Sequence, residues 1–185
     1  MSPDPLRWGV LGTGRITRAL IAALRASPRN HVVAAASRTQ ARAEEFAREW
    51  SLPRAFGGYE AMLEDPGVDV VYNALPNHLH AEWTIAAARR GKHVLCEKPL
   101  ALTADDVGRM AEAARPAGVV VAEAGMYRHH PQTRKVKELV DGGAVGALRL
   151  VRGAFSFTLT RPEDVRLDPA CGGGSLWDVG CYPVS

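Results

Sequence analysis

The sequence predicts an α/β protein whose first part folds into a doubly wound parallel sheet. Short apolar runs alternate with helical patterns from the start of the chain to about residue 123. A glycine turn joins the first apolar run to the first helical pattern. A further run, His93–Cys96, ends directly in Glu97-Lys98-Pro99, at the edge where parallel sheets bind ligands.

Six apolar runs are the expected strands of this sheet. They are Leu6–Leu11, His31–Ala36, Arg54–Phe56, Val68–Ala74, His93–Cys96 and Val119–Ala122. The expected helices between them begin at Ile16, cover Gln40–Trp50, Tyr59–Glu64 and His78–Arg90, and follow a capping box at Thr103-x-x-Asp106. Residues 1–123 are therefore predicted to form one domain with a doubly wound parallel sheet.

The pattern changes after residue 123. A helix is expected at Pro131–Asp141, and Ala147–Thr160 has strand character with alternating apolar and polar residues. A strand with one polar face is typical of an open-faced antiparallel sheet. Gly172–Gly174 is expected to be a flexible loop, and Ser175-x-x-Asp178 predicts a helix that starts near Leu176. We expect residues 124–185 to be the truncated start of an α+β domain.

Composition excludes several classes of protein. The chain has 185 residues, with 46% hydrophobic and 23% charged residues and a net charge of +3, which favours neither nucleic acid nor a membrane surface as a partner. No apolar run approaches the roughly 20 residues of a membrane span, and the N-terminus lacks the pattern of a signal peptide. Three scattered cysteines without a CxxC pair favour a reducing, cytoplasmic location. No metal site is expected, because His78-x-His80 lacks further ligands at suitable spacing.

The glycine turn has the context that a dinucleotide fingerprint requires. Gly12, Thr13 and Gly14 stand between a strand and a helix. Gly12 permits the tight turn, and Gly14 lets the backbone approach a pyrophosphate at the start of the helix. The third position of the fingerprint is Thr17 instead of Gly or Ala, which predicts looser packing of the helix on the strand.

The end of the second expected strand indicates which dinucleotide is bound. An acidic residue there holds the ribose 2′-hydroxyl of NAD, whereas an arginine accommodates the 2′-phosphate of NADP. The sequence has Ser37-Arg38 at this place, with Arg42 one helical turn later, and no acid. NADP is therefore favoured over NAD. The alternative is that Arg38 is merely solvated and either cofactor binds.

Three residues are candidates for proton transfer, and each also has a structural interpretation. Lys98 lies at a strand end, and Asp178 and Tyr182 stand four apart on one expected helix. An ammonium lowers the pKa of a nearby phenol, so Lys98 either activates Tyr182 or moves the proton itself. Alternatively, Lys98 is a surface residue, Asp178 caps its helix and Tyr182 is a half-buried aromatic residue.

The stretch Met126–His130 offers weaker candidates. Arg128, after Tyr127, is either a group that holds a polar substrate or part of a surface ion pair. His129-His130 beside Pro131 is expected to be a turn, with a substrate contact as the alternative.

Several of these stretches together resemble the glucose–fructose oxidoreductase, inositol dehydrogenase and MocA (GFO/IDH/MocA) family. The resemblance covers the whole chain. It rests on GVLGTGRI, NALPNHLHAEW, GKHVLCEKPLA, EAGMYRHHPQ and GGGSLWDVGCYPV. The sequence is most similar to the dihydrodiol dehydrogenase and NADP-linked xylose dehydrogenase branch, whose last motif reads DxGxY as here. Inositol dehydrogenases carry His in place of Tyr182.

The resemblance implies roles that the residues alone leave open. Together with the glycine turn, it implies that residues 1–123 form a dinucleotide-binding domain of the Rossmann type. It implies that Lys98 is catalytic, that the Lys98–Pro99 bond is cis, that Tyr182 is the acid/base, and that Asp178 contributes to the substrate site. Tyr127 and Arg128 are further expected substrate contacts. The cofactor is expected to lie on Gly12, Thr13, Gly14, Arg15, Ile16, Ser37, Arg38, Leu75, Pro76, Asn77, His80, Glu97 and Lys98.

The resulting functional prediction is an NADP-preferring oxidoreductase. It would transfer a hydride between the nicotinamide and a hydroxyl or carbonyl group of a sugar, polyol or dihydrodiol. The resemblance implies an open-faced sheet that builds the substrate site and usually the oligomer interface, so a homo-oligomer is expected at full length. Family members usually exceed 300 residues, so most of this sheet is expected to be absent here. The alternatives are an NAD-linked inositol- or aldose-type dehydrogenase, a non-catalytic NAD(P)-binding regulator and an inactive truncated fragment. The sequence does not specify the substrate or the reaction direction.

Overall fold

A computed structural model describes residues 4–184 of the chain. These residues fall into two compact units, 4–123 and 124–184. Only the first contains a sheet among the described residues.

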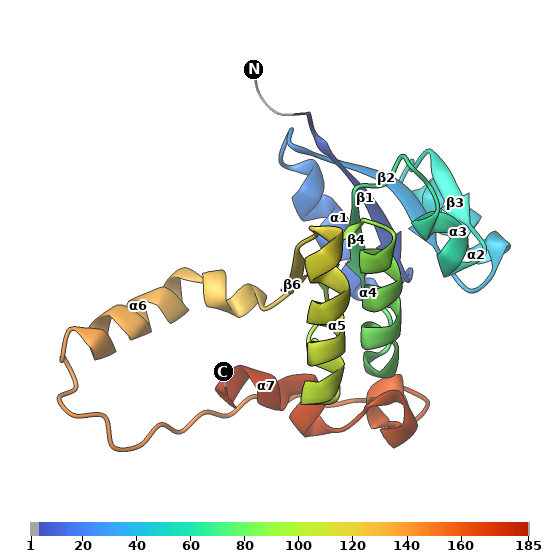
Figure 1. Ribbon diagram of the computed structural model, residues 1–185. Helices are drawn as coiled ribbons and strands as arrows, with labels where there is room; N and C mark the ends of the chain where they lie inside the picture. Colours follow the sequence, from blue (N-terminus) through green and yellow to red (C-terminus); the bar gives the residue numbers. More distant parts are fainter. Residues whose placement is uncertain (1–3, 185) are drawn as a thin grey trace. The chain divides into compact units, whose positions relative to one another are not determined.

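Unit 1 is built on six parallel strands in the order β3-β2-β1-β4-β5-β6 (Figure 1). The fold class predicted from the sequence, a doubly wound parallel sheet, is therefore confirmed. The strand bounds are β1 Leu6–Leu11, β2 Asn30–Ala36, β3 Arg54–Phe56, β4 Val70–Asn73, β5 His93–Cys96 and β6 Val121–Glu123.

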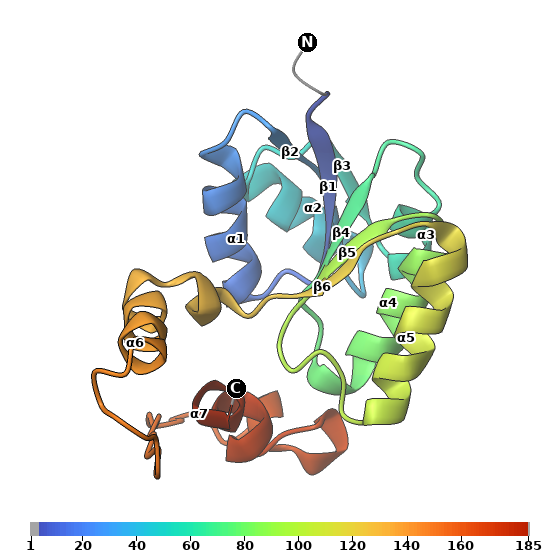
Figure 2. The same ribbon diagram turned by 60° about the vertical axis from the view of Figure 1, so that its left-hand side comes forward.

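Helices cover both faces of this sheet, with α1 and α2 on one side and α4 and α5 on the other (Figure 2). The bounds are α1 Arg15–Arg25, α2 Gln40–Glu49, α3 Tyr59–Leu63, α4 His80–Arg89 after the 3₁₀ turn Asn77–Leu79, and α5 Ala104–Ala117. The predicted capping box of α5 is formed, because the Asp106 N–H donates to Thr103 Oγ1 at 3.1 Å.

The strands alternate between two hydrophobic cores. Leu11 and Val71 pack into the core that contains α3 and α4, while Val10 and Tyr72 pack into the core that contains α1 and α2. Successive side chains of a strand point to opposite faces, so a strand that is buried on both faces needs an almost continuous apolar run. This requirement explains why the predicted apolar runs coincide with the strands.

The strand order determines where a ligand site is built. β1 lies between β2 and β4. The chain adds β2 and β3 on one side of β1 and then β4, β5 and β6 on the other, so the direction of strand addition reverses at β1. Ligands bind outside the carboxyl ends of the strands at such a switch point. The loops after β1, β2, β4 and β5 all lie along this carboxyl edge.

Basic side chains hold the opposite, amino edge of the sheet. Lys92 is only 8% exposed, and its Nζ donates to the carbonyl oxygens of Asp65 and Val68, each at 2.8 Å. Arg54 donates to the Asp65 carboxylate at 2.7 Å and to the Gly67 carbonyl at 3.0 Å. Burial lowers the pKa of Lys92, which nevertheless keeps both carbonyls satisfied.

Replacing Lys92 with methionine is expected to lower the free energy of unfolding by about 2–3 kcal/mol, because the buried Val68 carbonyl oxygen and the partly buried Asp65 carbonyl oxygen lose their donor. Urea denaturation followed by circular dichroism measures the change. Arg89→Met, on the exposed end of α4, is the control and is expected to stay within about 0.5 kcal/mol of the parent protein. Equal effects of the two substitutions would contradict this assignment.

Unit 2 contains short helical segments. They are the 3₁₀ turn Met126–His129, α6 Pro131–Asp141, the 3₁₀ turns Val165–Leu167 and Pro169–Cys171, a π-helical turn Leu176–Gly180, and α7 Cys181–Val184. The helix predicted at Pro131–Asp141 is therefore confirmed, and a helical segment starts at Leu176 as expected.

Two local expectations for unit 2 are not met. Residues 147–160 form no strand, because no neighbouring segment among the described residues pairs with them and isolated extended backbone lacks the ladder that defines a strand. The loop Gly172–Gly174 is held by backbone hydrogen bonds, whereas a flexible loop was expected. The Gly173 and Gly174 N–H groups donate to the carbonyls of Asp168 and Arg166 at 2.9 and 2.8 Å. A Cβ on Gly173 would lie 2.6 Å from the Asp168 carbonyl oxygen, so only glycine fits there.

Candidate functional site

The glycine turn after β1 leaves space beside the start of α1. Gly12 has φ +91°, a conformation that favours glycine, and a Cβ there would lie 3.1 Å from the Ala74 carbonyl oxygen. Gly14 differs, because its backbone is extended (φ −75°) and an added Cβ would meet nothing within 4 Å. Gly14 is therefore required neither by backbone conformation nor by packing.

The start of α1 has the features of an anion site. Gly14 is the N-cap residue, it offers no side-chain cap, and no acidic residue stands in the first turn. The first N–H groups of an eleven-residue helix are thus left for an external acceptor. Open space at Gly14 beside these N–H groups fits the pyrophosphate of a dinucleotide. Thr13, Arg15 and Ile16 complete this turn.

Thr17 packs tightly, contrary to the expectation of looser packing. Its side chain is fully buried, and Oγ1 donates to the Gly12 carbonyl oxygen at 2.9 Å. The hydroxyl thus satisfies a carbonyl group of the glycine turn, which explains why a residue larger than Ala is accommodated.

The end of β2 presents two arginines. Ser37 is buried and its N–H donates to the Phe56 carbonyl, whereas Arg38 and Arg42 are exposed. Burial raises the pKa of Tyr59, and the positive charges of Arg38 and Arg42 both oppose this shift. Two cations and no acid at this strand end fit a phosphate better than a ribose hydroxyl.

Asn73 organises the loop that follows β4. It is fully buried, and its Nδ2 donates to the His80 carbonyl at 3.1 Å and to Thr84 Oγ1 at 3.2 Å. Its Oδ1 accepts from the Leu75 N–H at 3.4 Å. The loop Leu75-Pro76-Asn77 is thus tied to both the strand end and the start of α4.

Glu97 and Lys98 follow β5 at the same edge. Glu97 is 9% exposed, and its Oε1 accepts from the Tyr72 hydroxyl at 2.5 Å. Its Oε2 accepts from the Lys98 N–H at 3.2 Å. Burial and the neighbouring carboxylate of Glu97 raise the pKa of Tyr72, so this phenol remains a hydrogen-bond donor. The Lys98–Pro99 peptide bond is cis, as expected.

His80 lies in the interior of unit 1. Its side chain is 0% exposed, and its ring nitrogens lie 2.7 Å from the Pro99 carbonyl oxygen and 2.8 Å from that of Leu75. Both ring nitrogens therefore contact backbone carbonyl oxygens. The ring links the loop after β4, at Leu75, to the turn after β5, at Pro99.

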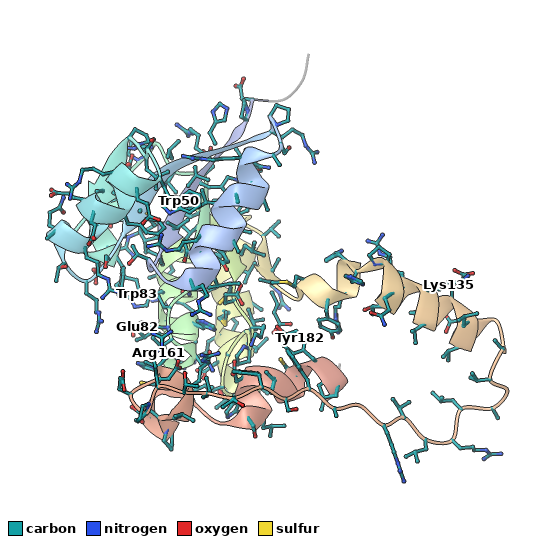
Figure 3. The ribbon with its side chains drawn as sticks, turned by 180° about the vertical axis from the view of Figure 1, so that it is seen from behind. Trp50, Glu82, Trp83, Lys135, Arg161 and Tyr182 are labelled. Atoms are coloured by element: carbon teal, nitrogen blue, oxygen red, sulfur yellow. The ribbon has the colours of Figure 1, made fainter. Side chains whose placement is uncertain are left out.

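Unit 2 brings two of the expected substrate residues together. The rings of Tyr127 and Tyr182 meet edge to face with centroids 5.3 Å apart, and Phe155 approaches Tyr182 at 5.2 Å. Tyr182 projects from α7 (Figure 3). These rings border a cavity of about 660 Å³, which is lined by Met126, Tyr127, His129, His130, Pro131, Gln132, Thr133, Phe155 and Tyr182.

Asp178 stands in the first turn of the π-helical segment, where the helix dipole favours a carboxylate. Ser175 has helical dihedrals and makes no side-chain cap. Asp178 Oδ2 also lies 3.7 Å from Arg166 Nη1. Arg166 also forms a two-bond pair with Asp164, with both distances 2.9 Å. Asp178 thus belongs to a charged cluster beside the π-helical turn.

The remaining candidates of unit 2 have modest local roles. Arg128 Nε contacts the Tyr127 hydroxyl at 3.5 Å, and His130 Nδ1 accepts from the Gln132 N–H at 3.2 Å as the N-cap of α6. His130 therefore ends a turn, as expected. Within residues 4–184, no three His, Cys, Asp or Glu side chains are grouped to hold a metal ion.

The structure adds residues that the sequence analysis did not single out. Tyr72, Asn73 and Tyr59 act at the carboxyl edge of the sheet, and Arg166 acts in unit 2. Tyr72 and Asn73 are polar residues at the end of an otherwise apolar strand. This break in the apolar pattern is visible in the sequence and could have marked them as residues of the site.

The fold of unit 1 and the residues at the carboxyl edge of its sheet together define a protein with a Rossmann-type dinucleotide-binding unit. The profile of the oxidoreductase family with an NAD-binding Rossmann fold matches residues 6–124, and that of the GFO/IDH/MocA C-terminal domain matches residues 133–185. The chain belongs to the GFO/IDH/MocA oxidoreductase family.

Similar proteins include well-defined dehydrogenases and reductases. D-xylose 1-dehydrogenase (NADP⁺) 2 of Haloferax volcanii is 47% identical over 182 residues, which cover 97% of this chain and 55% of the relative. Trans-1,2-dihydrobenzene-1,2-diol dehydrogenase of Danio rerio is 41% identical, with 97% of this chain and 54% of the relative covered.

A solved structure supports the same family. KijD10, a 3-ketoreductase from Actinomadura kijaniata in complex with NADP and TDP-benzene, superposes with a TM-score of 0.92 and 40% identity. The match covers 98% of this chain and 56% of KijD10. The chain thus spans a little more than half the length of the relatives it matches. Among the described residues, no helix has the length and apolar character needed to cross a membrane.

Proposed function

We propose that this chain belongs to an NADP-preferring oxidoreductase that interconverts a hydroxyl and a carbonyl group on a sugar, polyol or dihydrodiol. Residues 1–123 would be its dinucleotide-binding domain, and residues 124–185 would begin its substrate and oligomerisation domain. The observation that carries the proposal is the carboxyl edge of the sheet in unit 1, where the Gly14 turn, Arg38 and Lys98 follow the parallel strands β1, β2 and β5.

The cofactor would be held by the loops of this edge. The α1 amides after Gly14 would bind the pyrophosphate, and Ser37 with Arg38 would bind the 2′-phosphate. The loop Leu75–Asn77 and Glu97 would border the nicotinamide half, and His80, which was expected to contact the cofactor, would support this loop through the Leu75 carbonyl. NADP supplies the hydride acceptor or donor when bound.

The chain's own residues would move the proton. In unit 1, the Lys98 ammonium would donate to or accept from the reacting oxygen, or stabilise a phenolate. In unit 2, Tyr182 would be the acid/base, and Asp178 with Tyr127 and Arg128 would contact substrate hydroxyls. The ion pair with Arg166, whose Nη1 lies 3.7 Å from Asp178 Oδ2, supports an oriented carboxylate.

The substrate class follows from the relatives and from the cavity of unit 2. The relatives above are named for D-xylose and for a dihydrobenzenediol, both of which carry vicinal hydroxyls on a ring. Tyr127, Phe155 and Tyr182 offer apolar faces for the carbon side of such a ring. A homo-oligomer at full length remains part of the proposal. So does a cytoplasmic location, which the three free cysteines support.

An NAD-linked inositol- or aldose-type dehydrogenase is the second candidate, and the basic β2 end disfavours it. A non-catalytic regulator and an inactive fragment are not favoured, because the similar proteins are dehydrogenases and reductases.

Titration of the protein with NADPH and NADH, followed by fluorescence, tests the proposal. Arg38→Ala is expected to weaken NADPH about 10- to 100-fold, since a hydrogen bond to a charged group contributes roughly 1.5–3 kcal/mol, and to leave NADH unchanged. Arg48→Ala, on the exposed far end of α2, is the control and should change neither affinity. Equal loss of both cofactors in Arg38→Ala would remove the basis for NADP preference.

A further inference from the structure

The turn that carries Lys98 is held at successive backbone groups by side chains from three other positions. The Lys98 N–H donates to Glu97 Oε2 at 3.2 Å. The Pro99 carbonyl oxygen lies 2.7 Å from His80 Nδ1, and the Leu100 N–H donates to Glu123 Oε1 at 2.9 Å. Since Pro99 has no N–H, its carbonyl oxygen is the only backbone group of this residue that a partner can hold by a hydrogen bond.

His80 is the most deeply buried of these partners. Its side chain is fully inaccessible, whereas Glu123 is exposed and its hydrogen bond competes with water. Asn73 fixes the start of α4 from which His80 projects, because its Nδ2 donates to the His80 carbonyl and to Thr84. The ring therefore sits on a rigid support between the loops that follow β4 and β5.

The protonation state of the ring limits what it can hold. Burial lowers the pKa of His80, and His78 acts in the same direction. The Pro99 and Leu75 carbonyls and the Glu97 carboxylate act in the opposite direction. With the pKa below its usual value, the ring is neutral at neutral pH and carries one N–H for two facing carbonyl oxygens.

We expect the single ring N–H to donate to the Pro99 carbonyl oxygen and not to that of Leu75. The loop after β4 is already anchored through the hydrogen bond from the Leu75 N–H to Asn73 Oδ1. Pro99 offers no equivalent N–H. Nδ1 lies 2.7 Å from the Pro99 carbonyl oxygen, within reach of a hydrogen bond.

We propose that His80 is a positioning residue for Lys98: its Nδ1–H donates to the Pro99 carbonyl and so fixes the turn from which the Lys98 side chain projects. This inference rests on the proposed catalytic role of Lys98. His80 would not touch the substrate or the cofactor.

Matched variants separate positioning from simple support of the core. His80→Asn retains an amide donor near the place of Nδ1, His80→Leu removes the donor, and His78→Leu changes the exposed neighbour as a control. In the holoenzyme, His80→Leu is expected to lower kcat about 10-fold or more, with KM and the NADPH Kd within about 2-fold, since small displacements of a reacting group cost rate and not affinity. His80→Asn should restore kcat to within about 3-fold, and His78→Leu should leave it unchanged.

Two measurements on the protein without substrate address the same point. Nitrogen-15 NMR of labelled histidine is expected to show His80 protonated at Nδ1 and not at Nε2. Amide hydrogen exchange is expected to become faster at Leu100 in His80→Leu, while the amides of β4 keep their protection.

Each outcome has a distinct meaning. An Nε2–H tautomer, an even rise of exchange throughout unit 1, or equal kcat in His80→Asn and His80→Leu would overturn the inference. Failure of the unaltered protein to bind NADPH or to turn over any substrate would overturn the proposed function instead. The tautomer and the exchange pattern would still decide whether His80 fixes the Lys98 turn.

Discussion

Lys98→Met is expected to lower kcat by about 10²- to 10⁴-fold, the range that a general acid or base contributes. The NADPH Kd should change by less than about 3-fold, because the substitution keeps most of the side-chain length while it removes the charge and the N–H donors. Steady-state kinetics with D-xylose or a dihydrodiol, together with a fluorescence titration of NADPH, measure both quantities.

An exposed lysine provides the control for this substitution. Lys135 lies on α6, where it pairs with Glu138 at 2.6 Å on the surface (Figure 3). Lys135→Met should leave kcat and the NADPH Kd unchanged. If Lys98→Met kept more than about one tenth of the activity, Lys98 would not be the proton-transfer group.

Tyr182→Phe extends the same measurement. If Tyr182 and Lys98 both serve the same proton transfer, both variants should lose comparable activity, and their combined loss should fall well short of the product of the single losses. If Lys98 moves the proton itself, Tyr182→Phe should retain most of the rate.

Gly14→Val is expected to raise the NADPH Kd about 100-fold, equivalent to about 2.8 kcal/mol, without loss of stability. Gly14 has φ −75° and ψ 178°, which valine adopts readily, and a Cβ there meets nothing within 4 Å. The new side chain would occupy the space that the pyrophosphate requires. A fluorescence titration and a thermal melt, carried out on the same sample, test both parts.

Gly12→Ala is the contrasting variant. Gly12 has φ +91°, and a Cβ there would lie 3.1 Å from the Ala74 carbonyl oxygen. This change should lower the free energy of unfolding by about 1–3 kcal/mol. Its main effect should be on stability and not on the NADPH Kd. A Gly14→Val protein that binds NADPH as tightly as the parent would exclude this turn as the pyrophosphate site.

Local chemistry explains what the sequence could predict about the site. Glycines at Gly12 and Gly14 between a strand and a helix have few other uses, and Arg38 follows its strand directly. These patterns involve residues that are close together in the sequence, so they can be recognised before the fold is known. The roles of Lys98, Asp178 and Tyr182 came only with the family resemblance.

Other features depend on contacts that the residue pattern does not show. Thr17 looked like a poor fit to the glycine fingerprint, but its hydroxyl is buried against the Gly12 carbonyl. Asp178 stands in the first turn of its helical segment, and its carboxylate also lies 3.7 Å from Arg166 Nη1. In each case the partner follows from how the chain folds back, which spacing alone does not encode.

The sequence by itself determined that unit 1 is a parallel sheet with a dinucleotide fingerprint, because strands buried on both faces require continuous apolar runs and a tight turn requires glycine. Only the tertiary structure decided the strand order and the burial of His80 between the Leu75 and Pro99 carbonyls. It also decided that residues 147–160 are not a strand, since a strand exists only with a partner. Hydrogen bonds between distant segments set these features, and a linear pattern carries no record of which segments meet.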